Sequence, residues 1–327
     1  MILNFGCCFY PTTVVCVDDD THLLHWMVLL LEGSFNIVSF HDPIKCVAFI
    51  KKELSAKRNN AITSFYDESM GDVRAHIKKI HQLIYDAGRN KEISTLVVDY
   101  YMPAMNGLEL CELFKKDACK KIILTGEGDQ SLAVKAFNNA SIDQFVMKGQ
   151  ANALEDTQVQ VKRMQQQYFI EKTRFFLEFL TRVEPMVFSY FDDVDLCVQL
   201  DLLLQKRAIK EIYLFSHDSE YLMIDHENKI WWLSIMNQYS VDMLIQTAEN
   251  ELLQEPSPEV ELVFNNIKSK RQFPLHALSK KILEIKDWER ILTEPIVMNT
   301  AKETYHILLA PDLGLADLRY QDIKFIK

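Results

Sequence analysis

The stretch Thr95–Cys111 reads "TLVVDYYMPAMNGLELC", and its short apolar run ends on a single carboxylate, that of Asp99. Burying an unpaired carboxylate is costly, so this charge must emerge at the end of a strand or meet a cation. A glycine, Gly107, lies eight residues beyond the carboxylate. The stretch therefore predicts a buried strand that carries Asp99 to the edge of a sheet, where the rest of the chain must supply its partners.

On both sides of this stretch, segments with strand character and segments with helix character alternate. Short apolar runs predict strands at 12–17, 36–40, 95–99, 121–125 and 144–148. Apolar residues three and four apart, together with capping residues, predict helices at 21–32, 44–54, 108–116, 131–140 and 153–168. Alternation of this kind predicts an α/β fold, with a parallel sheet and helices on both of its faces.

Polar side chains follow several of the predicted strands at the point where each strand ends. Asp18 and Asp19 follow the first strand, Asp99 ends the third, Thr125 ends the fourth and Lys148 ends the fifth. In open parallel sheets, ligands bind in a crevice outside the carboxyl ends of the strands. We therefore expect Asp99 to lie beside two carboxylates, a hydroxyl and an ammonium.

Three carboxylates in one crevice repel each other unless a hard cation binds them. Mg²⁺ takes oxygen ligands and keeps waters that a phosphoryl oxygen can replace. Lys148 would then pair with a transferred phosphoryl group, and Thr125 would donate a hydrogen bond to it. Because phosphoryl transfer needs mainly positioning and charge neutralisation, these residues predict a Mg²⁺-dependent phosphoryl-transfer site.

The motifs "VDDD", "VVDYYMPAMNGLEL", "ILTG" and "FVMKG" resemble the receiver domain of two-component response regulators over about residues 12–150. The resemblance implies a doubly wound sheet of five parallel strands in the order 2-1-3-4-5. It also implies that Asp99 is the phosphoacceptor, and that the phosphate comes from a phosphohistidine of a partner histidine kinase or phosphotransfer protein. An alternative is a receiver that signals without phosphorylation, but the intact acidic pair, Thr125 and Lys148 argue against it.

The same resemblance assigns roles to the other residues of the site. The implied magnesium ligands are Asp18, Asp19 and the backbone carbonyl of Tyr101. The implied phosphate-binding and switch residues are Thr125, Lys148 and Phe145. Phosphorylation would then change dimerisation, or contacts with the C-terminal domain, through the face formed by the fourth helix, the fifth strand and the fifth helix.

Two features depart from the family pattern. Gly149 follows the lysine where family members usually have a proline, and 80 residues separate Asp19 from Asp99, more than is usual. The excess falls at about residues 55–92 and contains a predicted helix with one apolar face, formed by Val73, Ile77, Ile80 and Ile84. We favour a helix that packs on the domain over a surface for a partner or a second copy.

The chain divides on these patterns into a receiver domain at 1–168, with its insertion, and an α+β output domain at 169–327. In the output domain, three strands joined by turns at His217-Asp218 and Glu227-Asn228 predict a small antiparallel sheet. The helix that begins at 153 carries a short 3-4 apolar repeat, either a coiled coil or the last receiver helix packing on its own sheet. Its pattern continues to about residue 183.

Composition limits the classes of function. Net charge is −10 overall, and after residue 150 there are 20 Lys and Arg against 28 Asp and Glu, which weighs against a broad phosphate-binding surface. Seven cysteines, an odd number, indicate reduced thiols in the cytoplasm. The start resembles no signal peptide, and no apolar run is long enough to span a membrane.

The output domain shows no cyclic-dinucleotide, Walker-loop, kinase or basic helix-turn-helix motif. One basic cluster lies at Lys268, Lys270 and Arg271 beside Phe273, and the polar pairs His217/Asp218 and Asp225/His226 lie at predicted turns. Solvated surface and turn chemistry explain these residues better than nucleic-acid binding or catalysis. The histidine pairs His22/His25 and His76/His81 lack a third metal ligand.

We therefore expect a cytoplasmic regulator that is no enzyme beyond its own phosphoryl transfer, forms a homodimer on phosphorylation and has a protein-binding or small-ligand output. Nucleotide-binding, nucleic-acid-binding and enzymatic outputs remain alternatives. The segments "RNKEISTLVVDYYMPAMNGLEL", "AFNNASIDQFVMK" and "QQQYF" also resemble Lqs-type quorum-sensing response regulators, which would imply control by cell density.

Overall fold

The computed structural model describes residues 6–32, 35–58, 73–86, 88–126, 139–254, 256–275 and 292–311. The chain divides into two compact units. The first unit contains Phe9–Asp67 and Gln82–Arg174, and the second contains Met1–Cys8, Glu68–His81 and Phe175–Lys327.

The first unit is built on a sheet of five parallel strands in the order β3-β2-β4-β5-β6, which is the predicted order 2-1-3-4-5. Its strands are β2 (Thr13–Val17), β3 (Asn36–Phe40), β4 (Ile93–Asp99), β5 (Lys120–Thr125) and β6 (Gln144–Met147). The helices that accompany the sheet are α1 (Thr21–Leu31), α2 (Pro43–Arg58), α4 (Gly107–Leu113) and α6 (Ala153–Val183). The predicted α/β class and doubly wound topology are confirmed.

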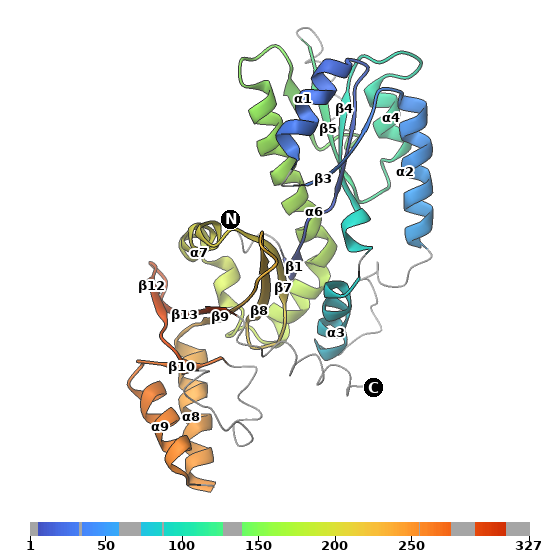
Figure 1. Cartoon of the computed structure of the whole chain (residues 1–327). Coiled ribbons are helices and arrows are strands. Elements are labelled where there is room, and N and C mark those ends of the chain that lie inside the picture. The colour runs from blue at the N-terminus through green and yellow to red at the C-terminus, as the bar shows by residue number, and fades with distance from the viewer. Residues whose placement is uncertain are drawn as a thin grey trace. The chain divides into compact units, whose positions relative to one another are not determined.

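The two faces of this sheet bury different side chains, because successive residues of a strand point to opposite faces. On one face Val15, Val98 and Ile123 pack with side chains of α2 and α4. On the other face Cys16 and Val97 pack with side chains of α1 and α6. Figure 1 shows the same layers, with α1 and α6 on one side of the strands and α2 and α4 on the other. The strands are therefore covered on both faces, and only their ends are open to a ligand.

The helices and strands of the first unit lie close to where the sequence predicted them. The strands agree to within two residues, and α6 continues through residue 183, as its sequence pattern indicated. A predicted helix at 131–140 lies mostly outside the described residues, of which 139 and 140 form a turn. The helix predicted in the insertion is present as α3 (Val73–Ile84), and a 3₁₀ turn, η3 (Arg89–Lys91), follows it.

The helix α3 has its apolar face buried rather than presented to solvent. Ile77 and Ile80 are buried, and the ring of His76 stacks on Phe176 at a centroid distance of 4.8 Å. Residues 68–81 belong to the second unit, although they precede β4 in the chain. The domain boundary at residues 168 and 169 stays a prediction, and the division between the compact units falls six residues later, within α6.

The second unit contains an antiparallel sheet, as predicted. Its six-stranded order is β1-β7-β8-β9-β13-β12, and a separate pair joins β10 to β11. The strands are β1 (Cys8–Phe9), β7 (Ile209–Leu214), β8 (Glu220–Asp225), β9 (Ile230–Met236), β10 (Phe273–Pro274), β11 (Leu292–Thr293), β12 (Ile296–Asn299) and β13 (Thr304–Pro311). The helices are η4 (Ser189–Asp192), α7 (Val194–Lys206), α8 (Gln238–Gln254) and α9 (Pro258–Lys268).

Local sequence explains where these elements begin and turn. Ser257 caps α9 through the backbone N–H of Val260, and Pro258 takes the first helical position, where a missing N–H does no harm. The predicted turns at 217–218 and 227–228 connect β7 to β8 and β8 to β9. Asn228 adopts a φ of 63°, which asparagine tolerates better than most residues.

Candidate functional site

The carboxyl ends of the strands in the first unit bring a lysine and two carboxylates into direct contact. The Nζ atom of Lys148, just after β6, lies 2.8 Å from Oδ2 of Asp18 and 2.7 Å from Oδ1 of Asp99. Asp18 follows β2, and Asp99 is the last residue of β4. The parallel register sets side by side residues that are 49 or more positions apart in the sequence.

Three carboxylates gather at this edge of the sheet. Carboxylate oxygens of Asp18, Asp19 and Asp99 lie within 4.8 Å of one another. Asp18 and Asp99 are buried, whereas Asp19 is exposed. Among the described residues, this is the one group of three or more acidic, histidine or cysteine side chains arranged closely enough to hold a metal ion. Its all-oxygen donor set suits Mg²⁺.

Burial and the neighbouring charges have opposing effects on the pKa values of Asp99 and Lys148. Burial raises the pKa of Asp99, the hydrogen bond from Lys148 lowers it, the negative charge of Asp18 raises it, and the net effect is a raised pKa. Burial lowers the pKa of Lys148, but its bonds to Asp18 and Asp99 outweigh burial and raise it. The ammonium is therefore held in its charged form between two acceptors.

The three consecutive carboxylates Asp18, Asp19 and Asp20 have different hydrogen-bond partners and different exposure. Oδ1 of Asp18 accepts a hydrogen bond from the Asp20 backbone N–H at 2.9 Å, which fixes its side chain. Asp20 caps α1 by accepting from the N–H groups of His22 and Leu23, and these bonds lower the pKa of Asp20. Asp18 is buried, whereas Asp19 and Asp20 are exposed, and of these two Asp19 belongs to the group of three carboxylates.

The segment after Asp99 must turn sharply back across the sheet edge. The N–H of Gly107 donates to the Tyr100 carbonyl at 2.9 Å, and a Cβ atom on Gly107 would lie 2.2 Å from the carbonyl oxygen of Asp99. No side chain fits there. Asn106 and Glu109 form a capping box that starts α4 directly after this turn.

The predicted switch and metal residues occupy different environments. Thr125 is fully buried, and its hydroxyl donates to the Gly126 carbonyl at 3.3 Å, a long contact. The ring of Phe145 is half-buried against the core between the sheet, α2 and α4. The Tyr101 side chain is 65% exposed, whereas Tyr100 packs against the core. Thr125 therefore lies at the same sheet edge as Asp99, and the long bond to Gly126 is what holds its hydroxyl among the described residues.

The residue after Lys148 differs from the family pattern without displacing the lysine. Lys148 has its backbone N–H bonded to the Thr125 carbonyl at 2.8 Å, so the ladder between β5 and β6 extends to the lysine. Gly149 follows it, and no cis peptide bond occurs within the described ranges. The ammonium nevertheless reaches both carboxylates.

The histidine pairs do not form metal sites among the described side chains. His22 and His25 lie exposed on α1. His76 stacks on phenylalanine rings, and Nε2 of His81 lies 2.9 Å from the Phe215 carbonyl oxygen. His76 and His81 therefore make packing and polar contacts, and His22 and His25 lie on the surface of α1.

The polar residues at the turns of the second unit form hydrogen bonds and an ion pair within those turns. The Asp225 carboxylate accepts from the N–H groups of Glu227 and Lys229 and from the indole of Trp231. His217 pairs with its neighbour Asp218 at 3.0 Å. These contacts are those expected of turn residues.

The basic cluster near α9 is also held by local contacts. Lys268 lies 5.1 Å over the ring of Phe264, and Lys270 donates to the Gln238 amide oxygen at 3.0 Å. Phe273 is fully buried, so its ring cannot stack on a base.

Three residues beside the site carry capping signals in the sequence that were not used to predict it: Asn106, Glu109 and Asp20. The spacing of Asn106 and Glu109 is the signature of a capping box. Asp20 is the preferred kind of residue immediately before a helix. Both show where a helix begins next to the acidic pocket, and so they fix the pocket's walls.

A doubly wound sheet of five parallel strands in this order, flanked by helices on both faces, has the fold of a receiver domain. Residues 55–158 match the family model of the response regulator receiver domain. The match includes Asp99, Thr125 and Lys148, and the fold adds Asp18 and Asp19 from the preceding segment. The chain therefore carries a receiver domain.

Solved structures extend the comparison. The response regulator LqsR of Legionella pneumophila is 24% identical, with a TM-score of 0.73 and coverage of 95% of this chain and 90% of that chain. The receiver domain of a LuxO repressor protein from Vibrio parahaemolyticus is 15% identical, with a TM-score of 0.34 and coverage of 49% of this chain and 95% of that chain. Comparison with curated protein sequences gives no match. The likeness to LqsR shows a shared fold.

Within the described ranges, no helix is both long enough and apolar enough to cross a membrane.

Proposed function

We propose that this chain is a response regulator that is phosphorylated on Asp99 by a partner histidine kinase or phosphotransfer protein. The observation that carries the proposal is the position of the Lys148 ammonium, 2.7 Å from Asp99 and 2.8 Å from Asp18. A charged lysine between two buried carboxylates, at the open edge of a sheet, is suited to neutralise an arriving phosphoryl group.

In the proposed reaction, a carboxylate oxygen of Asp99 forms a bond to phosphorus as the bond between phosphorus and the donor imidazole nitrogen breaks. The nitrogen leaves with the electron pair. Lys148 exchanges its contact with Asp99 for one with a phosphoryl oxygen, and Thr125 donates its hydroxyl to another. Within the part of the chain that the structure describes, the Thr125 hydroxyl makes one hydrogen bond, and it is long, so the side chain can turn toward the phosphate at little cost.

The acidic group fits a magnesium ion. Asp18, Asp19 and Asp99 would hold it with the backbone carbonyl of Tyr101, and the three carboxylates already lie within 4.8 Å of one another. When bound, Mg²⁺ neutralises charge on the phosphoryl oxygens. The buried carboxylates and Lys148 together keep this edge polar and highly charged before any phosphate arrives.

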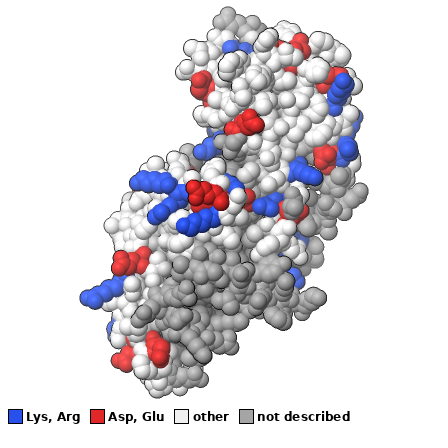
Figure 2. Space-filling view, viewed as in Figure 1, with Lys and Arg blue, Asp and Glu red and all other residues white. Residues whose placement is uncertain are grey.

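The proposed output is a change in dimerisation or in contacts of the C-terminal domain, with Phe145 turning as Thr125 moves. Figure 2 shows that Lys and Arg side chains on one face of the molecule have Asp and Glu side chains among them. This mixture, and the net charge of −10, support an output that binds protein or a small ligand. The resemblance to Lqs-type regulators extends the proposal to density-dependent control in the cytoplasm.

The test is incubation of the full chain with acetyl phosphate and Mg²⁺, read by intact mass and by size-exclusion light scattering. We expect one phosphate adduct in the wild type and in Asp156→Asn, an exposed carboxylate on α6, and none in Asp99→Asn. An adduct of equal yield in Asp99→Asn would remove the phosphoacceptor assignment. An adduct without a change in size would exclude dimerisation as the output.

A further inference from the structure

A second polar cluster lies at the opposite end of the sheet from Asp99. Glu92 immediately precedes β4, and its carboxylate faces Lys172 of α6, whose Nζ atom lies 2.8 Å from both carboxylate oxygens. The side chains are 6% and 9% exposed, respectively. This is a buried ion pair that the phosphoryl-transfer site does not use.

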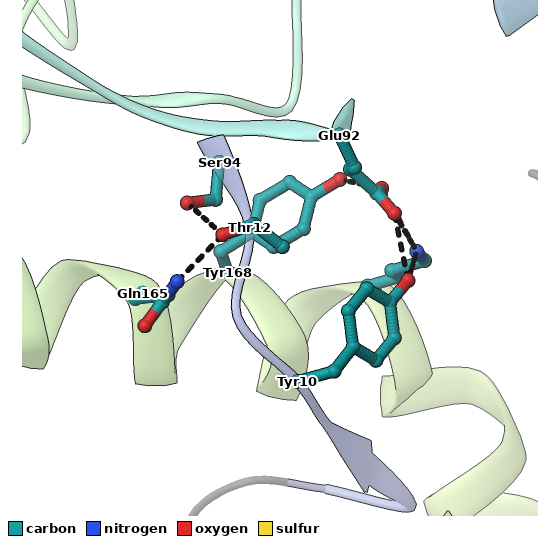
Figure 3. Close-up of polar contacts among 7 residues, drawn as sticks. Tyr10, Thr12, Glu92, Ser94, Gln165 and Tyr168 are labelled. Carbon is teal, nitrogen blue, oxygen red and sulfur yellow. Dashed lines mark hydrogen bonds and ion pairs between the residues drawn. The ribbon is translucent and has the colours of Figure 1, made fainter. Parts of the chain in front are cut away.

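Two tyrosines complete the pair, as Figure 3 shows. Tyr10 donates its hydroxyl to Oε2 of Glu92 at 2.7 Å and accepts from Lys172 at 2.9 Å, and Tyr168 donates to Oε1 of Glu92. The rings of Tyr10 and Tyr168 lie 5.4 and 5.8 Å from the ammonium. These bonds occupy all three hydrogens of the ammonium and both oxygens of the carboxylate. We call Tyr10, Glu92, Tyr168 and Lys172 the base cluster.

A second row of bonds runs parallel to the base cluster. Gln165 donates to the Thr12 hydroxyl at 2.6 Å, and Thr12 donates to the Ser94 hydroxyl at 2.6 Å. Gln165, Tyr168 and Lys172 are three and four residues apart, so they share one face of α6. Three elements are thus joined at one place: the segment before β2, the start of β4, and α6.

The contact between α6 and the start of β4 is polar, although an apolar contact would stabilise the fold equally well. Its polar character therefore indicates a role other than stability. Nearer its start, α6 packs on the sheet through Val161 and Met164, in the ordinary way. Burying two charges incurs a desolvation cost that apolar replacements avoid, so a buried ion pair is weak evidence for stability. Its geometric effect is stronger, since an apolar face tolerates sliding, whereas a lysine bonded to both carboxylate oxygens and flanked by two hydroxyls does not.

The base cluster lies on the two elements that connect the phosphoacceptor with the second unit. Glu92 and Asp99 are seven residues apart along β4, roughly 23 Å at the rise of an extended strand. The helix α6 runs on from Lys172 to Val183, and residues from Phe175 onward belong to the second unit. A shift of the sheet relative to α6 must therefore either break the base cluster or move the helix with it.

We propose that the base cluster couples Asp99 phosphorylation to the second unit by fixing α6 to the start of β4. With the cluster intact, a rearrangement at the carboxyl edge moves α6 as one body with the sheet. Without it, the helix slides on its apolar face and absorbs the change. The inference rests on the proposed function, because it specifies how phosphorylation of Asp99 is transmitted.

The test compares two double variants of the full chain with the wild type. In E92Q/K172M, the amide oxygen can accept from one tyrosine and the amide NH2 can donate to the hydroxyl of the other, while the ion pair is removed. The matched control is K120M/E171Q, which removes another strand-to-α6 ion pair, at 2.7 Å, one residue away along α6. Each protein is treated with acetyl phosphate and Mg²⁺, and the adduct is quantified by intact mass. Hydrogen exchange is then followed in peptides covering 175–183 and 194–206.

We expect the adduct in all three proteins. The exchange response of the second unit should persist in the wild type and in K120M/E171Q and fall about fivefold or more in E92Q/K172M, as for a typical coupling between sites. An undiminished response in E92Q/K172M would overturn the inference, as would an adduct without any response in the wild type. Absence of the adduct from the wild type would instead overturn the proposed function.

The single variant K172M distinguishes a loss of coupling from a loss of stability. K172M alone leaves Glu92 buried without its cation, and it should lower the melting temperature well below that of E92Q/K172M. If both variants melt together far below the wild type, the base cluster is a stability element, and the coupling inference fails.

Discussion

At the scale of single residues, Gly107 sets how closely the chain can return to Asp99. Alanine is favoured over glycine by about 1 kcal/mol in a helix interior, and Gly107 is the first residue of α4, so this gain is an upper limit here. The added Cβ would lie 2.2 Å from a backbone oxygen, and the backbone must shift to relieve this contact. We expect the clash to dominate and Gly107→Ala to lower the free energy of unfolding by about 1–3 kcal/mol in urea titrations.

The matched control for this prediction is Gly88→Ala. Its nearest neighbour would be the flexible Asp86 carboxylate at 3.0 Å, which can move aside. We expect a change within about 0.5 kcal/mol. Equal losses at the two glycines would show that backbone approach to Asp99 is not what requires Gly107.

Lys148 is the residue on which the proposed chemistry depends most. Lys148→Met keeps a side chain of similar length and removes the charge between Asp18 and Asp99. We expect the rate of adduct formation from acetyl phosphate to fall about 100-fold, the effect of removing one preorganised charge stabiliser. Lys115→Met, at an exposed site on the same unit, should leave the rate unchanged. A rate in Lys148→Met within twofold of the wild type would exclude the lysine from phosphoryl transfer.

The strand-end residues could be predicted because each follows an apolar run, and parallel strands bring their carboxyl ends together. Asp18, Asp99 and Lys148 meet for that reason. The base cluster could not be predicted in the same way. Glu92 and Lys172 read as solvated charges in their local sequence, and their partners lie about 80 residues away in the chain.

At the scale of elements, α1 begins directly after the acidic pocket and exposes a large aromatic side chain. Trp26 is 59% exposed, and tryptophan is enriched among the residues that contribute most of the binding energy at protein interfaces. We expect Trp26→Ala to slow transfer from a phosphorylated protein donor about tenfold, a loss of about 1.4 kcal/mol, without changing the rate with acetyl phosphate.

The control for α1 is Leu113→Ala, which removes a side chain of similar exposure, 50%, from α4. It should leave both rates unchanged. If Trp26→Ala slows both donors equally, the tryptophan supports the fold of the pocket rather than partner binding.

The turn between β8 and β9 depends on a carboxylate. Burial raises the pKa of Asp225, but hydrogen bonds from Trp231 and from the backbone of Lys229 and Glu227 outweigh it, and the net pKa is lowered. Because the folded-state pKa lies below the ordinary value of 3.8, this stabilisation is present above that pH and is lost as pH falls through the folded-state pKa.

We therefore expect Asp225→Asn to lower the free energy of unfolding by about 1–3 kcal/mol at pH 7, the range for hydrogen bonds to a charged group. The difference from the wild type should shrink below pH 3.8. Urea titrations at pH 7 and pH 3 measure it, with the exposed Asp242→Asn as control. A difference that is the same at both pH values would show that the charge of Asp225 does not stabilise the turn.

The inserted helix α3 shows why an element can be predicted while its place is not. Its periodic apolar residues indicated a buried face, and Ile77 and Ile80 are buried. The sequence position, between two receiver strands, suggested that the helix packs on the receiver. Residues 68–81 instead belong to the second unit, because the rings that cover His76 come from α6 beyond residue 175.

At the scale of the whole molecule, the helix α6 belongs to both compact units. Composition and motifs could not predict where along this helix one unit ends and the other begins. The sequence showed the helical pattern from 153 to about 183, and α6 is continuous over Ala153–Val183. It did not show which of the two units each half of the helix would join, since that depends on side chains of Tyr10 and Glu92 that approach from elsewhere. Continuity predicts helix content, whereas contacts between residues far apart in the chain decide how the units are divided.

The effect of Mg²⁺ on thermal stability and hydrogen exchange should differ between the two units. An ion bound only by the folded receiver stabilises it by mass action, about 2.7 kcal/mol at a concentration 100 times the dissociation constant. Thermal unfolding with Mg²⁺ and with a chelator should therefore show a shift in the wild type, together with slower hydrogen exchange in residues 93–125 and no change in residues 209–236.

The variants for this measurement come from the same acidic run. Asp18→Asn removes a buried ligand and should abolish the Mg²⁺-dependent shift. Asp20→Asn should retain it, because asparagine caps a helix as well as aspartate and Asp20 faces α1 rather than the pocket. Equal shifts in the two variants would place the ion elsewhere, and protection in residues 209–236 would mean that the metal acts on the second unit as well.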